Sequence, residues 1–165
     1  MYGTIRHEIR IHRTAADVWA LAGDATKLHT WFPGIVNCTV DGNIRVITMG
    51  SGMPMPEEIL VIDHAQRRFQ YRITAPLFVH HRGTIDVIEL TDDECIVVYS
   101  TEADPRTMAL VIGGGTAGAL TELKRQMEDT TGTTTGTTTG TTTGTTTGPT
   151  TGPTNDTAEL TEADH

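Results

Sequence analysis

The sequence has few of the residue patterns by which enzyme chemistry is usually recognised. Its two cysteines, Cys38 and Cys95, lack the spacing of a metal site or a disulfide framework, so reduced structural thiols are expected. Its histidines show no metal-ligand spacing. It contains no nucleophile–base pair, no phosphate-binding loop and no dinucleotide fingerprint. The sequence therefore predicts no metal ion and no other cofactor, and any catalysis would depend on isolated polar groups.

Long apolar runs and clusters of basic residues are also missing. No stretch of 18 apolar residues occurs, and the N-terminus lacks the apolar core of a signal peptide, so a cytoplasmic protein without membrane insertion is expected. Twelve basic residues stand against 21 acidic ones, for a net charge of −9. This balance gives no basic surface for nucleic acid, which is excluded as a partner.

The composition changes abruptly at residue 130. Residues 130–154 repeat threonine and glycine with a four-residue period and contain no apolar side chain. Asn155–His165 is short and acidic. Such segments bury too little surface to offset the entropy lost on ordering. The sequence therefore predicts one domain over residues 1–129 and a disordered tail over residues 130–165.

A long helix is predicted over Asp104–Glu128. Asp104 can cap it, and Pro105 suits its first turn. Apolar or small residues follow at steps of three or four, which marks one helix face: Met108, Val111, Ile112, Gly115, Ala119, Leu123 and Met127. Four glycines, Gly113–Gly115 and Gly118, interrupt the helix, and each costs about 0.8–1 kcal/mol relative to alanine. They indicate either a kink or a slim helix face that leaves room for something beneath it.

The preceding chain alternates like β-structure apart from two short helical segments. A strand is predicted over residues 5–12, and the two helices are predicted at residues 14–22 and 25–30. Six short strands follow, and Ser51–Pro56 between two of them is expected to be a loop because it is rich in proline and glycine. The strands are predicted at Val36–Val40, Ile44–Met49, Glu57–Ile62, Arg68–Thr74, Val79–Leu90 and Glu94–Glu102. This order predicts an α+β fold, in which an antiparallel sheet is covered by the last helix.

Three stretches carry a resemblance to a known family: IRIHRTAADVWALAGDATKLHTWFPGIVNCTVDG, EEILVIDHAQRRFQYRIT, and the glycine-rich helix ending in ALTELKRQME. The chain resembles the helix-grip proteins of the START/Bet v 1-like (SRPBCC) superfamily over residues 3 to about 128, and most closely the polyketide cyclase/dehydrase-type members. The resemblance implies a curved seven-stranded antiparallel sheet wrapped around the last helix, with the two short helices closing one end. It also implies a ligand cavity between sheet and helix, which favours the slim-face interpretation of the glycines.

Within that fold, strand alternation decides which side chains point toward the cavity. The expected ligand-binding residues are Arg45, Ile47, Met49, Met53, Glu57, Ile59, Phe69, Tyr71, His81, Ile85, Tyr99, Thr101, Met108, Ile112 and Gly115. Ser51-Gly52-Met53-Pro54 is similar to the Ser-Gly-Leu-Pro gate loop of abscisic-acid receptors in the same superfamily. The partner latch of those receptors is not recognisable, so the similarity implies a mobile lip opposite Trp31 and Phe32 and not a hormone receptor.

For several of these residues the sequence allows more than one role. Glu57 either pairs with Arg45, contacts a ligand, or lies solvated at a strand end. Tyr71 and Tyr99 either pack in the core with satisfied hydroxyls or contact a ligand. His80 and His81 are adjacent on one strand and point to opposite faces, so they cannot hold a metal ion together.

Two functions are consistent with these residues. The first is binding of a hydrophobic small molecule, such as a lipid, a polyketide or an aromatic metabolite. The second is a polyketide cyclase/dehydratase-type enzyme in which Glu57, His81 or a tyrosine acts as general acid or base.

Truncating the chain after Asp129 should leave folding intact, because the tail has no apolar periodicity with which to pack on the domain. The melting temperature of the truncated protein, measured by circular dichroism, should lie within a few degrees of the full chain. A fall of about 10 °C, well beyond the effect of about 1 kcal/mol, would show that the tail docks on the domain.

Overall fold

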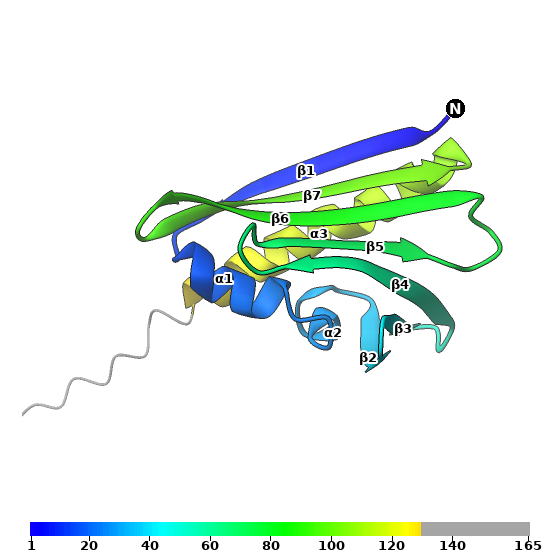
Figure 1. The fold of residues 1–165 in the computed structure, drawn as a ribbon, viewed down its shortest axis with the longest axis horizontal. Coiled ribbons are helices and arrows are strands. Elements are labelled where there is room, and N and C mark those ends of the chain that lie inside the picture. Colours follow the sequence, from blue (N-terminus) through cyan, green and yellow to red (C-terminus); the bar gives the residue numbers. More distant parts are fainter. Residues whose placement is uncertain (130–165) are drawn as a thin grey trace, which may run out of the picture. The chain divides into compact units, whose positions relative to one another are not determined.

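The computed structural model describes residues 1–129; the predictions made for residues 130–165 lie outside the described residues. Seven strands and three helices follow one another in the predicted order (Figure 1). They are β1 (Gly3–Ile11), α1 (Ala15–Ala22), α2 (Leu28–Trp31), β2 (Ile35–Asp41), β3 (Ile44–Met49), β4 (Pro54–Asp63), β5 (Arg68–Ile73), β6 (His80–Thr91), β7 (Glu94–Asp104) and α3 (Arg106–Asp129).

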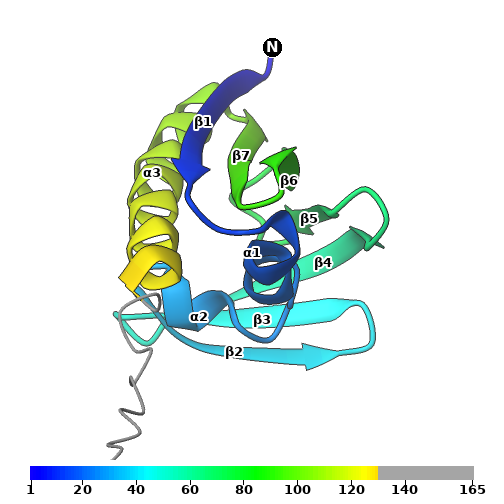
Figure 2. The same ribbon diagram turned by 90° about the vertical axis from the view of Figure 1, so that its left-hand side faces the viewer.

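All seven strands belong to one sheet in the order β1-β7-β6-β5-β4-β3-β2, and each neighbouring pair is antiparallel. The sheet curves so that β1 and β2 lie at its two ends, and α3 runs along its open side (Figure 2). The short helices α1 and α2 lie at one end of this arrangement (Figure 2). The predicted helix-grip architecture is confirmed.

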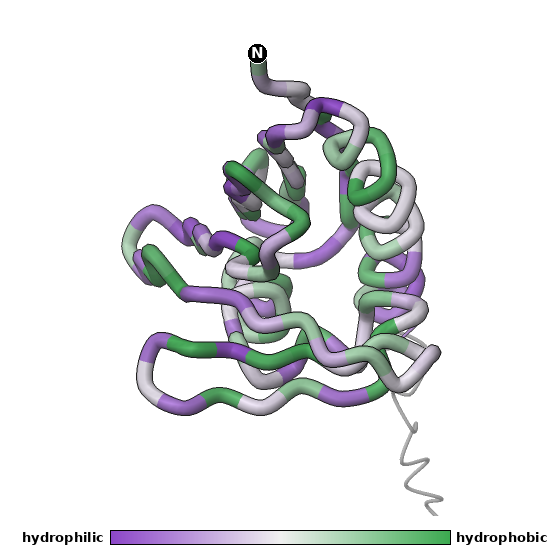
Figure 3. The backbone as a smooth tube through the Cα atoms, turned by 90° about the vertical axis from the view of Figure 1, so that its right-hand side faces the viewer, coloured by the Kyte–Doolittle hydropathy of each residue, from purple (hydrophilic) through white to green (hydrophobic). Residues whose placement is uncertain are grey.

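The buried face of the sheet follows from alternation along the strands. Polar and apolar residues alternate in many of them, which is visible along the tube in Figure 3. In β7 the inner residues Val97, Tyr99 and Thr101 are almost wholly buried, while the residues between them are partly exposed. Leu123 of α3 and Ile11 of β1 close the same core.

Local capping and turn chemistry set the ends of several elements. The Thr14 hydroxyl accepts a hydrogen bond from the Asp17 amide at 3.0 Å, which caps α1 as predicted. The β2–β3 hairpin turns through Gly42 and Asn43, and Gly42 has a φ of 58° that favours glycine.

Three predicted boundaries are wrong. β4 begins at Pro54, although Ser51–Pro56 was expected to be a loop. Both prolines of this segment pair with β3, opposite Thr48 and Val46, and the Pro56 carbonyl accepts a hydrogen bond from the Thr74 amide. β4 therefore keeps its place in the sheet although neither proline has an amide proton to donate. Asp104 does not cap α3 but ends β7, and the helix begins at Arg106. α2 is a single turn, Leu28–Trp31, shorter than the segment predicted.

The four glycines do not kink α3, which is continuous through them. Gly113 packs against β1, because a Cβ atom added there would lie 2.8 Å from two side-chain carbons of Ile5. Gly115 faces Phe32, with 3.1 Å between such a Cβ and the ring. Gly114 and Gly118 are exposed, and an added Cβ would meet nothing within 4 Å. The expected slim inner face is therefore formed by Gly113 and Gly115 alone.

No helix within residues 1–129 has the length and apolar character needed to cross a lipid bilayer.

A glycine-to-alanine substitution at two positions of α3 should separate two effects on stability: the gain in helix propensity and the loss of close contact with β1. Gly118→Ala should raise the free energy of unfolding by about 0.8–1 kcal/mol, because the helix gains propensity and the methyl group meets nothing. Gly113→Ala should be less stable than Gly118→Ala by about 1–3 kcal/mol, because Ile5 must move. Urea denaturation measures both values. Equal stabilisation by the two alanines would show that contact with β1 does not require Gly113.

Candidate functional site

A cavity of about 170 Å³ lies between α3, α2 and the inner face of the sheet. Most of its lining is apolar, and its polar side chains are a carboxylate and two tyrosine hydroxyls. The lining residues are Leu28, Phe32, Ile35, Ile47, Met49, Met55, Glu57, Tyr71, Ile73, Phe78, Tyr99, Met108, Val111, Ile112 and Gly115. The strands supply the floor of this cavity, and α3 supplies its roof from Met108 to Gly115.

The structure brings about half of the expected ligand-binding residues to this cavity. Those that line it are Ile47, Met49, Glu57, Tyr71, Tyr99, Met108, Ile112 and Gly115. The expected residues that do not line it are Arg45, Met53, Ile59, Phe69, His81, Ile85 and Thr101.

Different causes move these residues out of the lining. Met53 is 51% exposed, and its expected place is taken by Met55, since the alternation of β4 continues through the prolines. Phe69, Ile85 and Thr101 are buried on the inner face but are covered by other side chains. Ile59 is only partly buried, and it packs against the core. Trp31 is buried and does not form a lip at the mouth.

The lining also contains residues that were not among the expected ones. Val111 lies on the predicted apolar helix face, and Ile73 continues the alternation of β5, so both could have been found from periodicity. Leu28, Phe32, Ile35 and Phe78 come from a one-turn helix, a strand end and a loop. Their orientation has no sequence period, so only the tertiary structure reveals them.

Glu57 and Arg45 form an ion pair inside the protein. They lie opposite each other on β4 and β3, and Arg45 Nε donates a hydrogen bond to Glu57 Oε2 at 2.6 Å. Each side chain is 2% exposed. Glu57 lines the cavity and Arg45 does not, so the guanidinium lies behind the carboxylate. Its carbon is 4.9 Å from the ring centroids of both Phe69 and Tyr71, which adds cation–π attraction to the ion pair.

Burial and ion pairing shift the pKa values of Glu57 and Arg45 in opposite directions. Burial raises the pKa of Glu57, and the nearby Arg45 offsets only part of that rise. For Arg45, burial lowers the pKa, but the Glu57 carboxylate raises it, and the guanidinium stays charged. Of the roles considered for Glu57, the structure supports pairing with Arg45, and it places the carboxylate at the border of the cavity.

The hydroxyl groups of Tyr71 and Tyr99 are hydrogen-bonded to each other at the cavity wall. The two oxygens are 2.7 Å apart, and either can donate. Burial raises the pKa of both hydroxyls, so both stay protonated. Gly83 makes room for the Tyr71 ring, because a Cβ atom there would lie 2.3 Å from Tyr71 Cε1 and 2.7 Å from its hydroxyl oxygen. The missing side chain at Gly83 therefore leaves the space in which the Tyr71 ring lies.

His81 fills a gap in the sheet. Backbone pairing of β5 with β6 ends at Tyr71 and Gly83, and the Ile73 amide donates instead to His81 Nδ1 at 3.0 Å. Burial, with a smaller contribution from His80, lowers the pKa of His81 to about 4. The ring is therefore neutral at pH 7, and since Nδ1 accepts, its proton lies on Nε2. His81 thus has a structural partner, and it does not reach the cavity.

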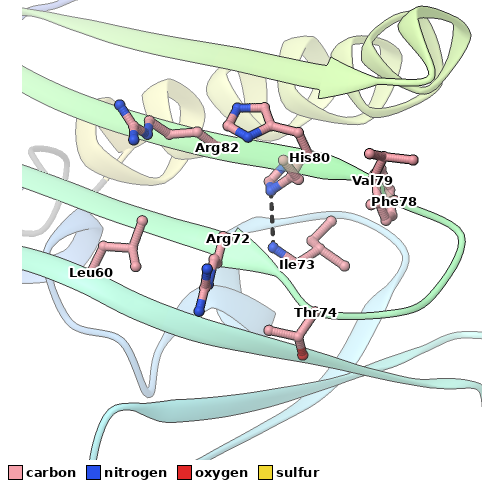
Figure 4. Close-up of a pocket in the computed structure, with 9 residues that line it drawn as sticks. Leu60, Arg72, Ile73, Thr74, Phe78, Val79, His80 and Arg82 are labelled. Carbon is pink, nitrogen blue, oxygen red and sulfur yellow. Dashed lines mark hydrogen bonds between the residues drawn. The ribbon is translucent and has the colours of Figure 1, made fainter. Parts of the chain in front are cut away.

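A second pocket, of about 510 Å³, lies on the outer face of the sheet at this gap (Figure 4). It is lined by Leu60, Arg72, Ile73, Thr74, Phe78, Val79, His80, His81 and Arg82. It is open to solvent, and Arg72 in it is already paired with Glu58. An apolar ligand gains more from the apolar lining of the inner cavity than from this polar surface.

Within the part of the chain that the structure describes, no three histidine, cysteine or acidic side chains come together in a group that could hold a metal ion.

The fold and its internal cavity are those of a helix-grip protein. The family model described as "Polyketide cyclase / dehydrase and lipid transport" matches residues 3–129. The chain therefore belongs to that family. No curated protein matches the chain at a significant level.

Solved structures share this fold. The protein XoxI from Bacillus cereus aligns with a TM-score of 0.73 and 22% identity, over 78% of this chain and 98% of its own. A START superfamily protein from Mycobacterium smegmatis aligns with a TM-score of 0.66 and 10% identity, over 77% and 98%. Norcoclaurine synthase from Thalictrum flavum, a point mutant in complex with a transition-state analogue, aligns with a TM-score of 0.64 and 18% identity, over 79% and 97%. At these identities the likeness concerns the fold.

The stability of the protein should fall between pH 6.5 and pH 4 through His81. The folded state keeps this imidazole neutral to about pH 4, whereas the unfolded chain takes up a proton near pH 6.5. The stabilisation is thus complete above pH 6.5 and is lost as the pH falls, by up to about 3 kcal/mol. His81→Asn keeps an acceptor for the Ile73 amide without a titrating group. Urea denaturation across this range should show a smaller loss in that variant.

The exposed His29 provides the control, since His29→Asn removes an imidazole without touching the sheet. If wild type and His81→Asn lose stability in parallel between pH 6.5 and pH 4, His81 does not titrate in the way described.

Proposed function

We propose that this protein binds a small hydrophobic molecule in the cavity between α3 and the sheet. The observation that carries the proposal is a largely apolar cavity in which the buried charge is already neutralised by pairing within the wall. Such a cavity offers apolar contact with a few fixed polar groups, which is the usual character of small-molecule sites. The family to which the chain belongs, described by polyketide cyclisation and lipid transport, supports the same conclusion.

The volume narrows the kind of ligand. About 170 Å³ is close to the size at which an engineered apolar cavity, of about 150 Å³, takes up benzene. A lipid or a polyketide of several rings would fill this volume and extend beyond it. Of the ligand classes expected from the sequence, the aromatic metabolite fits this cavity best.

The contacts of the candidate acid–base residues favour binding over cyclase/dehydratase catalysis. His81 is engaged by the Ile73 amide and lies outside the cavity lining. Glu57 is held by Arg45, and the tyrosines hold each other. A general acid or base needs a proton that it can give or take at neutral pH. The paired groups are better suited to orienting a ligand than to moving its protons.

Replacing Gly115 by leucine should weaken the binding of an apolar fluorescent dye of one or two aromatic rings. The new side chain would start beside Phe32 and project into the cavity that Gly115 lines. The dissociation constant, measured by fluorescence titration, should rise at least about tenfold, which corresponds to about 1.4 kcal/mol.

Gly114→Leu is the matched control, since it makes the same change one residue earlier, where the side chain points into solvent. It should bind the dye as wild type does. Equal binding by both variants, or by neither variant nor wild type, would contradict the proposal.

A further inference from the structure

The polar groups of the cavity are gathered at one place on its wall. Glu57 lies opposite Ile73 in the pairing of β4 with β5, so Tyr71 is its diagonal neighbour on the same face of the sheet. The Arg45 guanidinium contacts both, through the hydrogen bond to Glu57 and through the ring of Tyr71. Tyr99 joins this group through its hydroxyl. The remaining cavity surface is apolar apart from backbone groups.

We call the group formed by Glu57, Tyr71 and Tyr99 the polar end of the cavity. A count of its hydrogen-bond donors and acceptors shows which of them have no partner. Among residues 1–129, Arg45 is the only hydrogen-bond partner of the Glu57 side chain, and it uses Oε2. The carboxylate therefore retains acceptor capacity on Oε1. The two tyrosine hydroxyls carry two protons, and their mutual hydrogen bond uses one of them whichever residue donates. One O–H donor is left over. Arg45 Nη2 also has no hydrogen-bond partner, but it is buried and Arg45 does not line the cavity. The groups that border the cavity therefore present one carboxylate acceptor and one hydroxyl donor.

A hydroxyl group on a ligand matches this pair of requirements, because it donates one hydrogen bond and accepts others. A carbonyl group only accepts, and it would leave the lone pairs of Glu57 without a donor. An ammonium or a carboxylate group would bring an unpaired charge into a cavity whose own charges already cancel, and burying such a charge is costly.

The geometry points to a neutral, single-ring molecule bearing a hydroxyl group, which donates to the Glu57 carboxylate and accepts from the Tyr71–Tyr99 pair. This inference rests on the proposed function, since it names the ligand class for the same cavity.

Phenol and toluene provide a test, since they have nearly the same shape and differ in the hydroxyl group. Water holds phenol more strongly than toluene, so a purely apolar cavity would favour toluene. Isothermal titration calorimetry on the full chain at pH 7 should instead show phenol binding at least about tenfold more tightly than toluene. Benzoate, which carries a charge, should bind more weakly than phenol.

The variant Tyr71→Phe/Tyr99→Phe keeps the ring shapes and removes both hydroxyls. Its preference for phenol over toluene should fall several-fold, while toluene binding stays near that of wild type. Gly114→Leu serves as the control and should keep the preference.

Toluene binding as tightly as phenol to wild type would overturn the hydroxyl assignment, whereas binding of a small apolar molecule would stand. Tightest binding by benzoate would also overturn it, because Arg45 would then be the recognising group. If the apolar dye binds and none of the three rings does, the ligand class is wrong although the cavity functions. If neither the dye nor any ring binds, the proposed function fails as well.

Discussion

A curved sheet with one apolar face must cover that face, and in this protein a single helix does so. α3 spans the open side of a seven-stranded sheet, and the inner residues of β1 and β7 pack directly beneath it. The apolar surface removed from water there is the main favourable contribution to folding. One straight helix cannot follow the whole curve of a sheet. Toward β3, β4 and β5 the helix and the sheet separate, and the cavity lies between them.

The glycines of α3 adjust this distance on its two sides. At Gly113 the absence of a side chain lets the helix approach β1 closely, since a methyl group would press on Ile5. At Gly115 the same absence leaves space at the cavity and beside Phe32. Close packing on one side and open space on the other thus come from neighbouring positions of one helix. The exposed Gly114 and Gly118 have no contact in the structure that requires glycine.

Buried polar groups determine the chemical character of the cavity. Arg45 and Glu57 cancel each other's charge, and the cation–π contacts of Arg45 with Phe69 and Tyr71 let the cation remain behind the wall. A carboxylate oxygen therefore borders the cavity, while the Arg45–Glu57 pair as a whole carries no net charge. His81 stabilises the sheet instead, because its ring accepts a hydrogen bond from the Ile73 amide where the backbone pairing of β5 and β6 stops. A residue that alternation assigns to the cavity is thus used to complete a strand.

The sequence by itself determined the element order, the fold class and the inner face of most strands, because the periods of helices and strands are local properties of the chain. It also indicated the Arg45–Glu57 pair, since a buried carboxylate needs a partner and the two strands are adjacent along the chain. Only the tertiary structure decided which inner residues border the cavity. Phe69, Ile85 and Thr101 face inward but are covered by their neighbours, while Leu28, Phe32 and Phe78 reach the cavity from segments without a period. The gap that His81 fills depends on where two strands diverge, which is set by the curvature of the whole sheet and not by any local pattern.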